Sequence, residues 1–289
     1  MNKAIKPEQL YNFSIPQFIS RALAEDIGDG DHTSLACIPK DAKGKAKLLV
    51  KENGILAGVE LALQIFKAVD PALKVKVLLK DGSPIKVGDI VLTVEGSSQS
   101  ILVAERLVLN CMQRMSGIAT KTNMLVTLCK GTNAKVIDTR KTTPNLRGLE
   151  KWAVVIGGGA NHRIGLYDMI LIKDNHIDYA GGIPQAIKAA NEYLKANKKK
   201  LKIEIEARDL DEVKQILAIG KVHRIMLDNF SYADIRKAVK LIGGKYETEA
   251  SGGINEKTIR SFAKCGVDFI SVGALTHHIK SLDLSLKAI

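Results

Sequence analysis

Aromatic residues, paired cysteines and long apolar runs are scarce in this chain. Phe, Trp and Tyr make up 4% of the 289 residues, whereas proteins that grip single-stranded nucleic acid usually stack bases on exposed aromatics. The four cysteines are scattered without a CxxC pair, which fits reduced thiols better than a disulfide framework or a zinc site. No run approaches the roughly 18 apolar residues of a membrane span, and the opening MNKAIKPEQLYN lacks a signal-peptide core. We therefore expect an intracellular, cytoplasmic protein with no membrane partner.

Positive charge is plentiful and unevenly distributed. The formal net charge is +12; residues 116–289 carry 28 Lys and Arg against 18 Asp and Glu, whereas residues 1–115 carry 15 against 13. Such a balance is typical of chains that bind nucleic acid, anionic membranes or small anionic substrates. No helix-turn-helix, zinc-finger or RNA-recognition signature is found, and we interpret the run KKK at 198–200 as solvated surface.

The first half of the chain predicts a helix followed by short strands. Ser14 as N-cap and Pro16 in the first turn predict a helix over 14–27. Glycine-punctuated strands follow between residues 44 and 96, with a helix near 59–68 among them. A longer helix is expected from about Ser98 to Ser116.

The second half alternates strands with helices that close on glycine. The predicted strands are 134–138, 169–172, 202–207, 223–228, 246–250 and 268–273. This alternation favours a parallel sheet, either closed into a barrel or open and doubly wound. Polar residues follow nearly every predicted strand, as in barrels, whereas an open sheet would concentrate them at one switch point. We therefore expect a barrel, with fewer than eight strands because the half-chain is short.

Five cationic or ionisable side chains follow apolar runs within forty residues. Arg140 and Lys141 lie in DTRKTT, His162 and Arg163 follow three glycines in GGGANHR, and Lys173 follows MILI. Because Lys and Arg are rarely buried without partners, this cluster predicts a polyanionic ligand. Surface salt bridges, or a structural role for His162, are the alternative interpretations. In IKDNH, the three residues after Lys173 either join the site or fix the loop.

Two isolated acids end apolar strands in this basic half. Glu206 and Asp228 suit a hard cation such as Mg²⁺, which would bring substrate phosphates with it. Neutralisation of neighbouring lysines is the alternative. Glu204 shares the face of Glu206 on its strand, so the sequence leaves open which of the two points into the site.

Glycine turns follow the last two strands, in ASGGI and VGAL. Loops at this end of a barrel commonly bind phosphate through backbone N–H groups. Ser251, Gly252 and Gly273 are therefore candidates for a phosphate cradle.

Seven sequence blocks carry a family resemblance. They are ERLVLNCMQRMSGIAT, DTRKTTPNLR, GGGANHRIGLYDMILIKDNH, IEIEARDLDE, MLDNF, EASGGI and VGALTH. In order and spacing they resemble the quinolinate phosphoribosyltransferases, from EDIGDGDHTS to the C-terminus. The resemblance implies an α/β fold with an N-terminal α/β sandwich over 1–115 and an incomplete TIM-like α/β barrel over 116–279. The tail, 280–289, is expected to pack back on the sandwich.

The resemblance also implies an activity and a site. Quinolinate and phosphoribosyl pyrophosphate would give nicotinate mononucleotide, pyrophosphate and carbon dioxide in NAD biosynthesis, with Mg²⁺ as cofactor. The implied quinolinate ligands are Arg106 of the partner subunit in a homodimer, or hexamer, with Arg140, His162, Arg163 and Lys173. The implied phosphoribosyl pyrophosphate ligands are Lys141, Glu206, Asp228, Ser251, Gly252 and Gly273. Of these, Lys141, Glu206 and Asp228 would be catalytic, and Glu206 and Asp228 would hold the metal.

The chain departs from the family pattern at a few positions. Asn145 stands where TTPGLR usually has glycine, and Val155 stands where an arginine often precedes the triple glycine. Their effects on loop geometry and on a secondary charge remain open. A related enzyme that acts on nicotinate without decarboxylation, and a basic nucleic-acid-binding protein, are the alternative functions.

Overall fold

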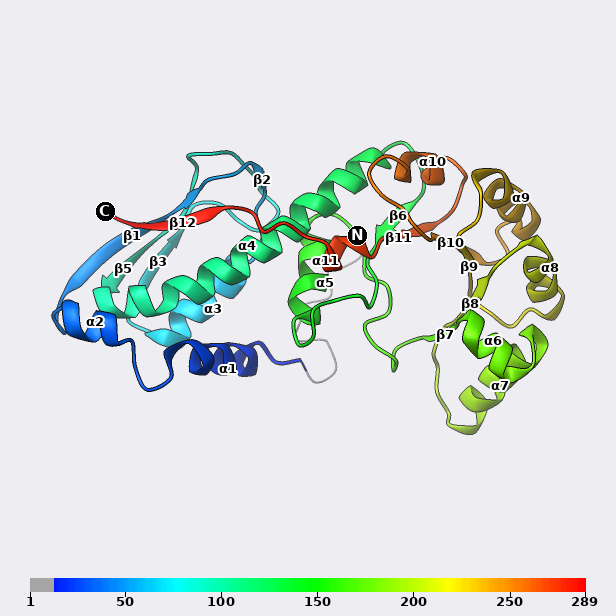
Figure 1. Cartoon of the computed structure of the whole chain (residues 1–289), viewed down its shortest axis with the longest axis horizontal. Helices are drawn as coiled ribbons and strands as arrows, with labels where there is room; N and C mark the ends of the chain where they lie inside the picture. The colour runs from blue at the N-terminus through cyan, green and yellow to red at the C-terminus, as the bar shows by residue number, and fades with distance from the viewer. Residues whose placement is uncertain (1–12) are drawn as a thin grey trace. The chain divides into compact units, whose positions relative to one another are not determined.

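The computed structural model describes residues 13–289, which form two compact units (Figure 1). The first contains the described residues up to 123, together with 143–158 and 278–289; the second contains 124–142 and 159–277. This division differs from the predicted boundary between residues 115 and 116, because the first unit continues to residue 123 and also contains residues 143–158. The C-terminal residues belong to the first unit, as expected of the tail 280–289. Residues 1–12 of the predicted first domain lie outside the described residues.

The first unit is built on an antiparallel sheet of four strands in the order β12-β1-β5-β3, with a two-stranded β2-β4 ribbon. Its elements are α1 (Ile15–Ile27), α2 (His32–Cys37), β1 (Lys43–Val50), β2 (Gly54–Ile55), α3 (Val59–Val69), β3 (Lys74–Val77), β4 (Pro84–Ile85), β5 (Ile90–Ser97), α4 (Ser98–Leu128), α5 (Arg147–Ile156) and β12 (Leu284–Ala288). The last strand, β12, pairs with β1 from Ala46↔Ala288 to Val50↔Leu284. The C-terminal residues therefore complete the sheet of this unit.

Two predicted helices of the first half are confirmed. α1 begins after Ser14, whose hydroxyl accepts a hydrogen bond from the Gln17 N–H, and Pro16 lies in its first turn. α3 corresponds to the helix predicted near 59–68.

Helix α4 is longer than predicted: it continues past Ser116 to Leu128. Glycine usually weakens a helix, but Gly117 has a packing role. A Cβ at this position would lie 2.3 Å from the carbonyl oxygen of Lys280. Ser116 and Thr120, on adjacent turns, hydrogen-bond the backbone N–H groups of Ala57 and Ile55. The glycine marks a close backbone crossing inside the helix.

The second unit is a six-stranded parallel sheet in the order β6-β11-β10-β9-β8-β7. Its elements are β6 (Lys135–Ile137), β7 (Ile170–Ile172), α6 (Asp174–Ala180), α7 (Ile183–Ala196), β8 (Ile203–Ala207), α8 (Leu210–Ile219), β9 (Arg224–Asp228), α9 (Tyr232–Ile242), β10 (Glu247–Ser251), α10 (Ile259–Ala263), β11 (Phe269–Ser271) and α11 (Ala274–His277). All six predicted strands are present. The unit is a barrel-like α/β domain that is incomplete, because the sheet ends at β6 and β7 and holds six strands.

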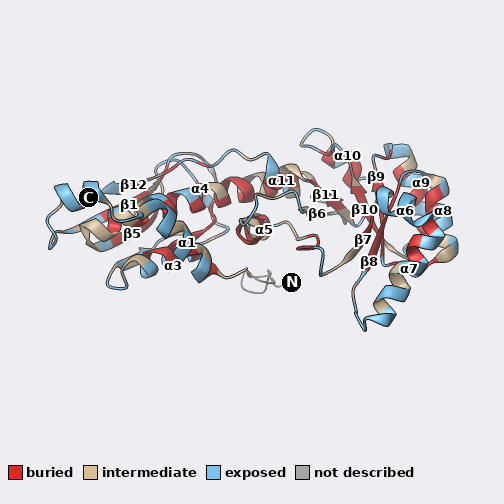
Figure 2. Cartoon of the chain, turned by 60° about the horizontal axis from the view of Figure 1, so that its bottom comes forward, coloured by how far each residue is buried: buried red, intermediate tan, exposed pale blue. Residues whose placement is uncertain are grey.

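In the second unit the strands are mostly buried, and helices α6 to α9 lie together on one side of them (Figure 2). All five residues of β8 are buried, including both glutamates, and the outer faces of α6, α7, α8 and α9 carry the exposed residues. Strands covered on both faces normally read as apolar runs, so acids inside them need a local explanation. No helix among residues 13–289 is long and apolar enough to cross a membrane.

Because the Lys280 backbone lies so close to Gly117, we expect a single added methyl group to destabilise the protein. Gly117→Ala places a Cβ against the Lys280 backbone, so we expect a loss of about 1–3 kcal/mol of stability despite the better helix propensity of alanine. Thermal unfolding followed by circular dichroism measures it. Met124→Ala, at an exposed position of the same helix, should change stability by less than about 0.5 kcal/mol; equal stability of Gly117→Ala and wild type would contradict the prediction.

Candidate active site

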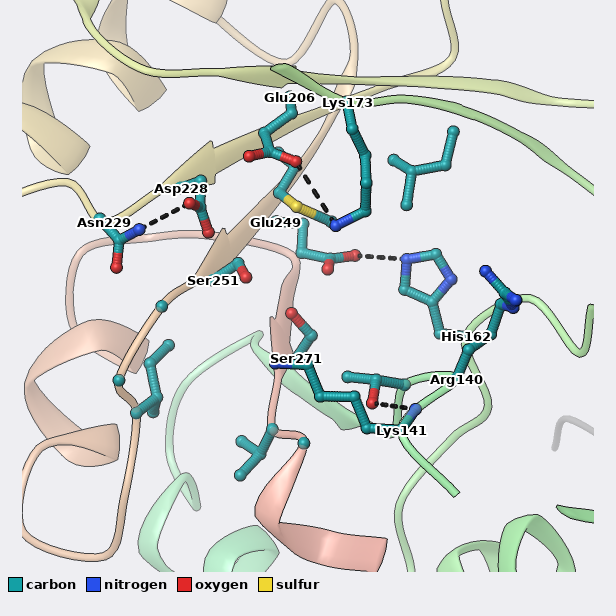
Figure 3. A pocket seen from close by; sticks show the side chains of 18 of the residues that line it. Arg140, Lys141, His162, Lys173, Glu206, Asp228, Asn229, Glu249, Ser251 and Ser271 are labelled. Atoms are coloured by element: carbon teal, nitrogen blue, oxygen red, sulfur yellow. Dashed lines mark hydrogen bonds and ion pairs between the residues drawn. The ribbon is translucent and has the colours of Figure 1, made fainter. Parts of the chain in front are cut away.

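A cavity of about 770 Å³ lies at the carboxyl ends of the strands of the second unit (Figure 3). Its walls come from the residues that follow all six strands and from the segment that carries His162 and Arg163. Every predicted site residue except Arg106 lines it: Arg140, Lys141, His162, Arg163, Lys173, Glu206, Asp228, Ser251, Gly252 and Gly273. The strand-end reasoning therefore predicted which side chains the fold brings together.

Arg106 belongs to the first unit, where it is exposed on α4. It is not among the residues that line the cavity of this chain. Its assignment to a partner's site stays a prediction.

The loop after β6 presents Arg140 and Lys141 as exposed cations at the rim. The Lys141 N–H donates to the Thr139 hydroxyl (3.0 Å), and its carbonyl accepts from the Thr276 hydroxyl (2.7 Å). A Cβ at Gly273 would lie 3.0 Å from the Lys141 Cδ. The glycine after β11 thus leaves room for the lysine stem while the main chain holds its base.

The segment that carries His162 and Arg163 is held beside β6 as an added stretch of extended chain. Ala160 bridges Ile137 in parallel, and the buried Asp138 carboxylate accepts hydrogen bonds from the His162 N–H (2.9 Å) and the Asn161 side chain (2.6 Å). Arg163 is also largely buried, and its guanidinium donates to the Met169 carbonyl (3.2 Å). Burial lowers the pKa of Arg163, and the nearby Arg140 lowers it further.

The ring of His162 points away from solvent, toward two acids that sequence reasoning did not assign to the site. Its Nε2 lies 3.1 Å from Glu204 Oε2 and 3.5 Å from Glu249 Oε2, and all three side chains are almost completely buried. Its Nδ1 accepts the backbone N–H of Arg163 (2.6 Å). Both ring nitrogens therefore face groups of the protein itself. The question left open for β8 is answered as well: Glu206 lines the cavity, and Glu204 lies in the buried cluster.

Arg224 neutralises this buried cluster. Its guanidinium lies 3.1 Å from Glu249, 3.1 Å from Glu247 and 3.9 Å from Glu204, and it stacks on the Phe269 ring at 3.8 Å. Burial, and then the neighbouring Glu204, raise the pKa of Glu249 to about 8; burial also raises the pKa of Glu204. One signal in the sequence pointed to this cluster, since KIEIEA and YETEA both place glutamates two residues apart on an otherwise apolar strand.

Two groups of acids have the chemistry to hold a cation. The ligand atoms of His162, Glu204 and Glu249 lie within 4.8 Å of one another, but the Arg224 guanidinium already supplies positive charge there. Glu206 and Asp228 instead border the cavity. Burial and the nearby Asp228 raise the pKa of Glu206, and its Oε2 is buried and accepts no hydrogen bond from the described residues. A pair of carboxylates that borders a polar cavity fits a hard cation, and the Lys173 ammonium partly offsets the charge of Glu206.

Lys173 and Glu206 both line the cavity and form an ion pair, with 3.8 Å between Lys173 Nζ and Glu206 Oε2. The residues that follow it fix the loop. α6 begins at Asp174, and His176 Nδ1 accepts the Lys173 N–H (3.1 Å) as part of the helix cap. None of the three residues after Lys173 lines the cavity, which decides between the two interpretations of IKDNH.

Glycine is required at the turn after β10. A Cβ at Gly252 would lie 2.1 Å from Asn229 Oδ1, and its φ of +101° is a conformation that other residues rarely adopt. Asn229, after β9, is itself left-handed (φ 56°), and its side chain donates to Asp228 (2.6 Å). The backbone is thus bent tightly on the side of the cavity opposite the cations of the β6 loop (Figure 3).

The triple glycine of GGGANHR is not part of the cavity lining. Gly157 ends α5, and a Cβ there would lie 2.5 Å from the Ala119 carbonyl oxygen of α4. This glycine therefore permits the close packing of α5 against α4.

The two departures from the family pattern are compatible with the fold. Asn145 adopts φ 64°, and asparagine tolerates this left-handed conformation better than most residues, so a loop built for glycine is preserved. Val155 lies on α5 in the first unit and is not among the residues that line this cavity.

The buried acids predict a pH-dependent stability. Between about pH 5 and pH 8 the folded chain keeps a proton on Glu249 that the unfolded chain has released, since the pKa rises from 4.5 to about 8 on folding. Wild-type stability is therefore lost as the pH rises through this range. Glu249→Gln removes the titratable group and, with it, this loss of stability. The melting temperature of the variant minus that of wild type should therefore increase from pH 5 to pH 8. A difference that stays constant with pH would contradict the assignment; Glu247→Gln, a partly exposed partner of the same Arg224, is the control.

Comparisons with known proteins agree with this geometry. Residues 31–116 match the N-terminal domain of quinolinate phosphoribosyl transferase, and residues 118–287 match its C-terminal domain. An Arabidopsis thaliana protein named nicotinate-nucleotide pyrophosphorylase [carboxylating], chloroplastic, is 46% identical over 99% of this chain and 86% of its own length. Crystal structures of NadC from Streptococcus pyogenes (TM-score 0.91, 39% identity, 97% of this chain and 99% of that one) and of the nicotinate-nucleotide pyrophosphorylase from Francisella tularensis (0.91, 40%, 98% and 99%) share the fold. The chain belongs to the quinolinate phosphoribosyl transferase family.

Proposed function

We propose that this chain is a nicotinate-nucleotide pyrophosphorylase (carboxylating), which makes nicotinate mononucleotide, pyrophosphate and carbon dioxide from quinolinate and phosphoribosyl pyrophosphate in NAD biosynthesis. The proposal rests on one observation: the cavity at the strand ends brings together several cations, a pair of acids and the glycine turns that follow β10 and β11. Both substrates are polyanions, so a cavity rimmed by Arg140, Lys141 and Lys173 offsets their mutual repulsion.

The two carboxylates of quinolinate are assigned to the side of the cavity that carries Arg140 and Arg163, with His162 and Lys173 beside them. A guanidinium binds a carboxylate through two parallel hydrogen bonds, and Arg163 is held in place by the Met169 carbonyl. In the proposed assembly the partner subunit's Arg106 completes this half of the site in a homodimer, with the hexamer as the larger alternative. Exposure of Arg106 on α4 supports that role.

Phosphoribosyl pyrophosphate is assigned to the opposite side. Ser251, Gly252 and Gly273 offer backbone and hydroxyl groups to its phosphates, and Lys141 lies next to Gly273. Glu206 and Asp228 are the residues proposed to hold Mg²⁺, which when bound supplies positive charge to the pyrophosphate.

The residues of this chain act mainly by placing the reactants and balancing charge. The ring nitrogen of quinolinate forms a bond to the anomeric carbon as the bond to pyrophosphate breaks, and Lys141 offsets the negative charge gathering on the leaving oxygen. Such a step passes through an oxocarbenium-like state and needs no strong base, so orientation is worth roughly 7–11 kcal/mol. The pyridinium then accepts the electron pair of the breaking carbon–carboxylate bond, and a proton replaces the lost carbon dioxide.

The cytoplasm remains the predicted location, because all four cysteines are free. Relatives from plants carry other locations in their names, chloroplastic in Arabidopsis thaliana and mitochondrial in Nicotiana tabacum.

The wild-type protein tests the function directly. With phosphoribosyl pyrophosphate and Mg²⁺ we expect carbon dioxide release from quinolinate and no nucleotide formation from nicotinate in a parallel reaction. Turnover with nicotinate alone would overturn the assignment of the two-carboxylate subsite. The absence of turnover with both quinolinate and nicotinate would overturn the proposed function.

Substitution of the rim cations separates the two halves of the site. Arg140→Ala should lower kcat/KM for quinolinate by about 10²-fold or more, because a substrate carboxylate loses its charged partner. Lys141→Ala should mainly lower kcat, because its charge is needed as pyrophosphate leaves. Lys264→Ala removes the same charge from an exposed position outside the cavity and should leave turnover unchanged. Steady-state kinetics with each substrate varied in turn measures this; near-normal turnover of Arg140→Ala would contradict the site.

A further inference from the structure

We propose that Glu204 and Glu249 are positioning residues of the quinolinate subsite, which hold the His162 imidazole in one orientation and one tautomer and, through it, the backbone of Arg163. The inference rests on the proposed function, because quinolinate is taken as the ligand of the Arg163 guanidinium. It gives a task to two buried glutamates that the assignment of substrate and metal ligands leaves unused.

The hydrogen bond from Arg163 defines the tautomer of His162. A backbone N–H can only donate, so the Nδ1 that receives it at 2.6 Å carries no proton. The ring proton is then on Nε2, which faces Glu204 at 3.1 Å and Glu249 at 3.5 Å. The backbone amide therefore selects the tautomer, and the two acids lie on the Nε2 side of the ring, where the proton is.

The ring in turn holds the peptide unit that carries Arg163. The N–H of His162 is fixed by Asp138 and the N–H of Arg163 by the His162 ring, so consecutive amides are tied to two different side chains. If the imidazole turned, the Arg163 N–H would lose its acceptor in a buried place, which is costly. The direction of the Arg163 side chain thus depends on contacts made at the buried end of the cavity, where His162 and Glu249 line it.

Arg224 stabilises this arrangement of His162 and the two acids. It comes from the strand between those of Glu204 and Glu249, and its guanidinium reaches both carboxylates. A metal ion among His162, Glu204 and Glu249 would compete with this guanidinium and would bind Nε2, which the proposed tautomer protonates. The geometry therefore favours a positioning cluster over a second metal site.

Nitrogen-15 NMR of the wild-type protein tests the tautomer without any substitution in the cluster. The His162 signals, identified by their loss in His162→Gln, should show an unprotonated Nδ1 and a protonated Nε2. A protonated Nδ1 in the neutral ring, or displacement of the Nε2 proton when Zn²⁺ alone is added, would overturn the proposal.

Variants test the consequence for substrate binding. Glu204→Gln and Glu249→Gln each replace a carboxyl group that faces His162 Nε2 by an amide, whose NH2 group cannot accept a hydrogen bond, so KM for quinolinate should rise about fivefold, with KM for phosphoribosyl pyrophosphate and kcat within about twofold. Glu247→Gln is the matched control: it is on the same strand as Glu249 and contacts the same Arg224, and it should leave KM for quinolinate unchanged. An equal rise in all three variants would show a general effect through Arg224 and would overturn the proposal, as would unchanged KM in the first two.

The two proposals fail separately. If the wild type turns over no quinolinate, the proposed function falls, whereas the tautomer measurement still decides whether the acids position His162. If the wild type is active and Nδ1 carries the proton, only the positioning role falls.

Discussion

The site depends on the parallel register of six short strands. Because Glu204 pairs with Arg224 and Arg224 with Glu247, while Glu206 and Glu249 both pair with Met226, the acids of β8 and β10 are stacked in two levels about β9. The lower level, Glu204 and Glu247, lies beside Arg224, and the upper level, Glu206 and Glu249, lines the cavity, with Glu249 also in contact with Arg224. A shift of one residue in either strand would turn these side chains to the opposite face, so the register specifies the substrate pocket as well as the core.

Burial of acids beneath an anion-binding cavity creates an electrostatic problem that Arg224 and His162 address together. Two ionised glutamates under a site for polyanions would repel the substrates. Arg224 supplies a compensating charge inside the sheet, and the raised pKa of Glu249 lowers the negative charge of the pair. The His162 ring lies between the acids and the cavity, where its Nε2 side faces the carboxylates. The floor is therefore polar and largely neutral, while the rim carries the net positive charge.

The sequence predicted the parts of this arrangement that depend on neighbouring residues, and it did not predict contacts between residues far apart along the chain. Strand ends are local signals, so Arg140, Lys173, Glu206 and Asp228 were found from apolar runs followed by polar residues, and the six strands with them. The partners of Arg224 lie about twenty residues away in both directions and are defined only by register, which no local pattern gives. The packing roles of Gly117 and Gly157 are likewise set by residues distant in sequence, because each lets a backbone from elsewhere in the chain approach closely.

The contacts of His162 reduce the number of cations that can bind the carboxylates of the substrate. Sequence reasoning counted His162 among the cations for one ring, but its two nitrogens face Arg163 and the buried acids. The cations that remain on this side are Arg140, Arg163 and Lys173, and the first two are close enough for Arg140 to lower the pKa of Arg163. Two guanidiniums held near each other repel until an anion lies between them. A ring with two adjacent carboxylates relieves this repulsion at both guanidiniums, whereas a ring with one carboxylate leaves one of them uncompensated, and this difference is the physical basis for preferring quinolinate over nicotinate.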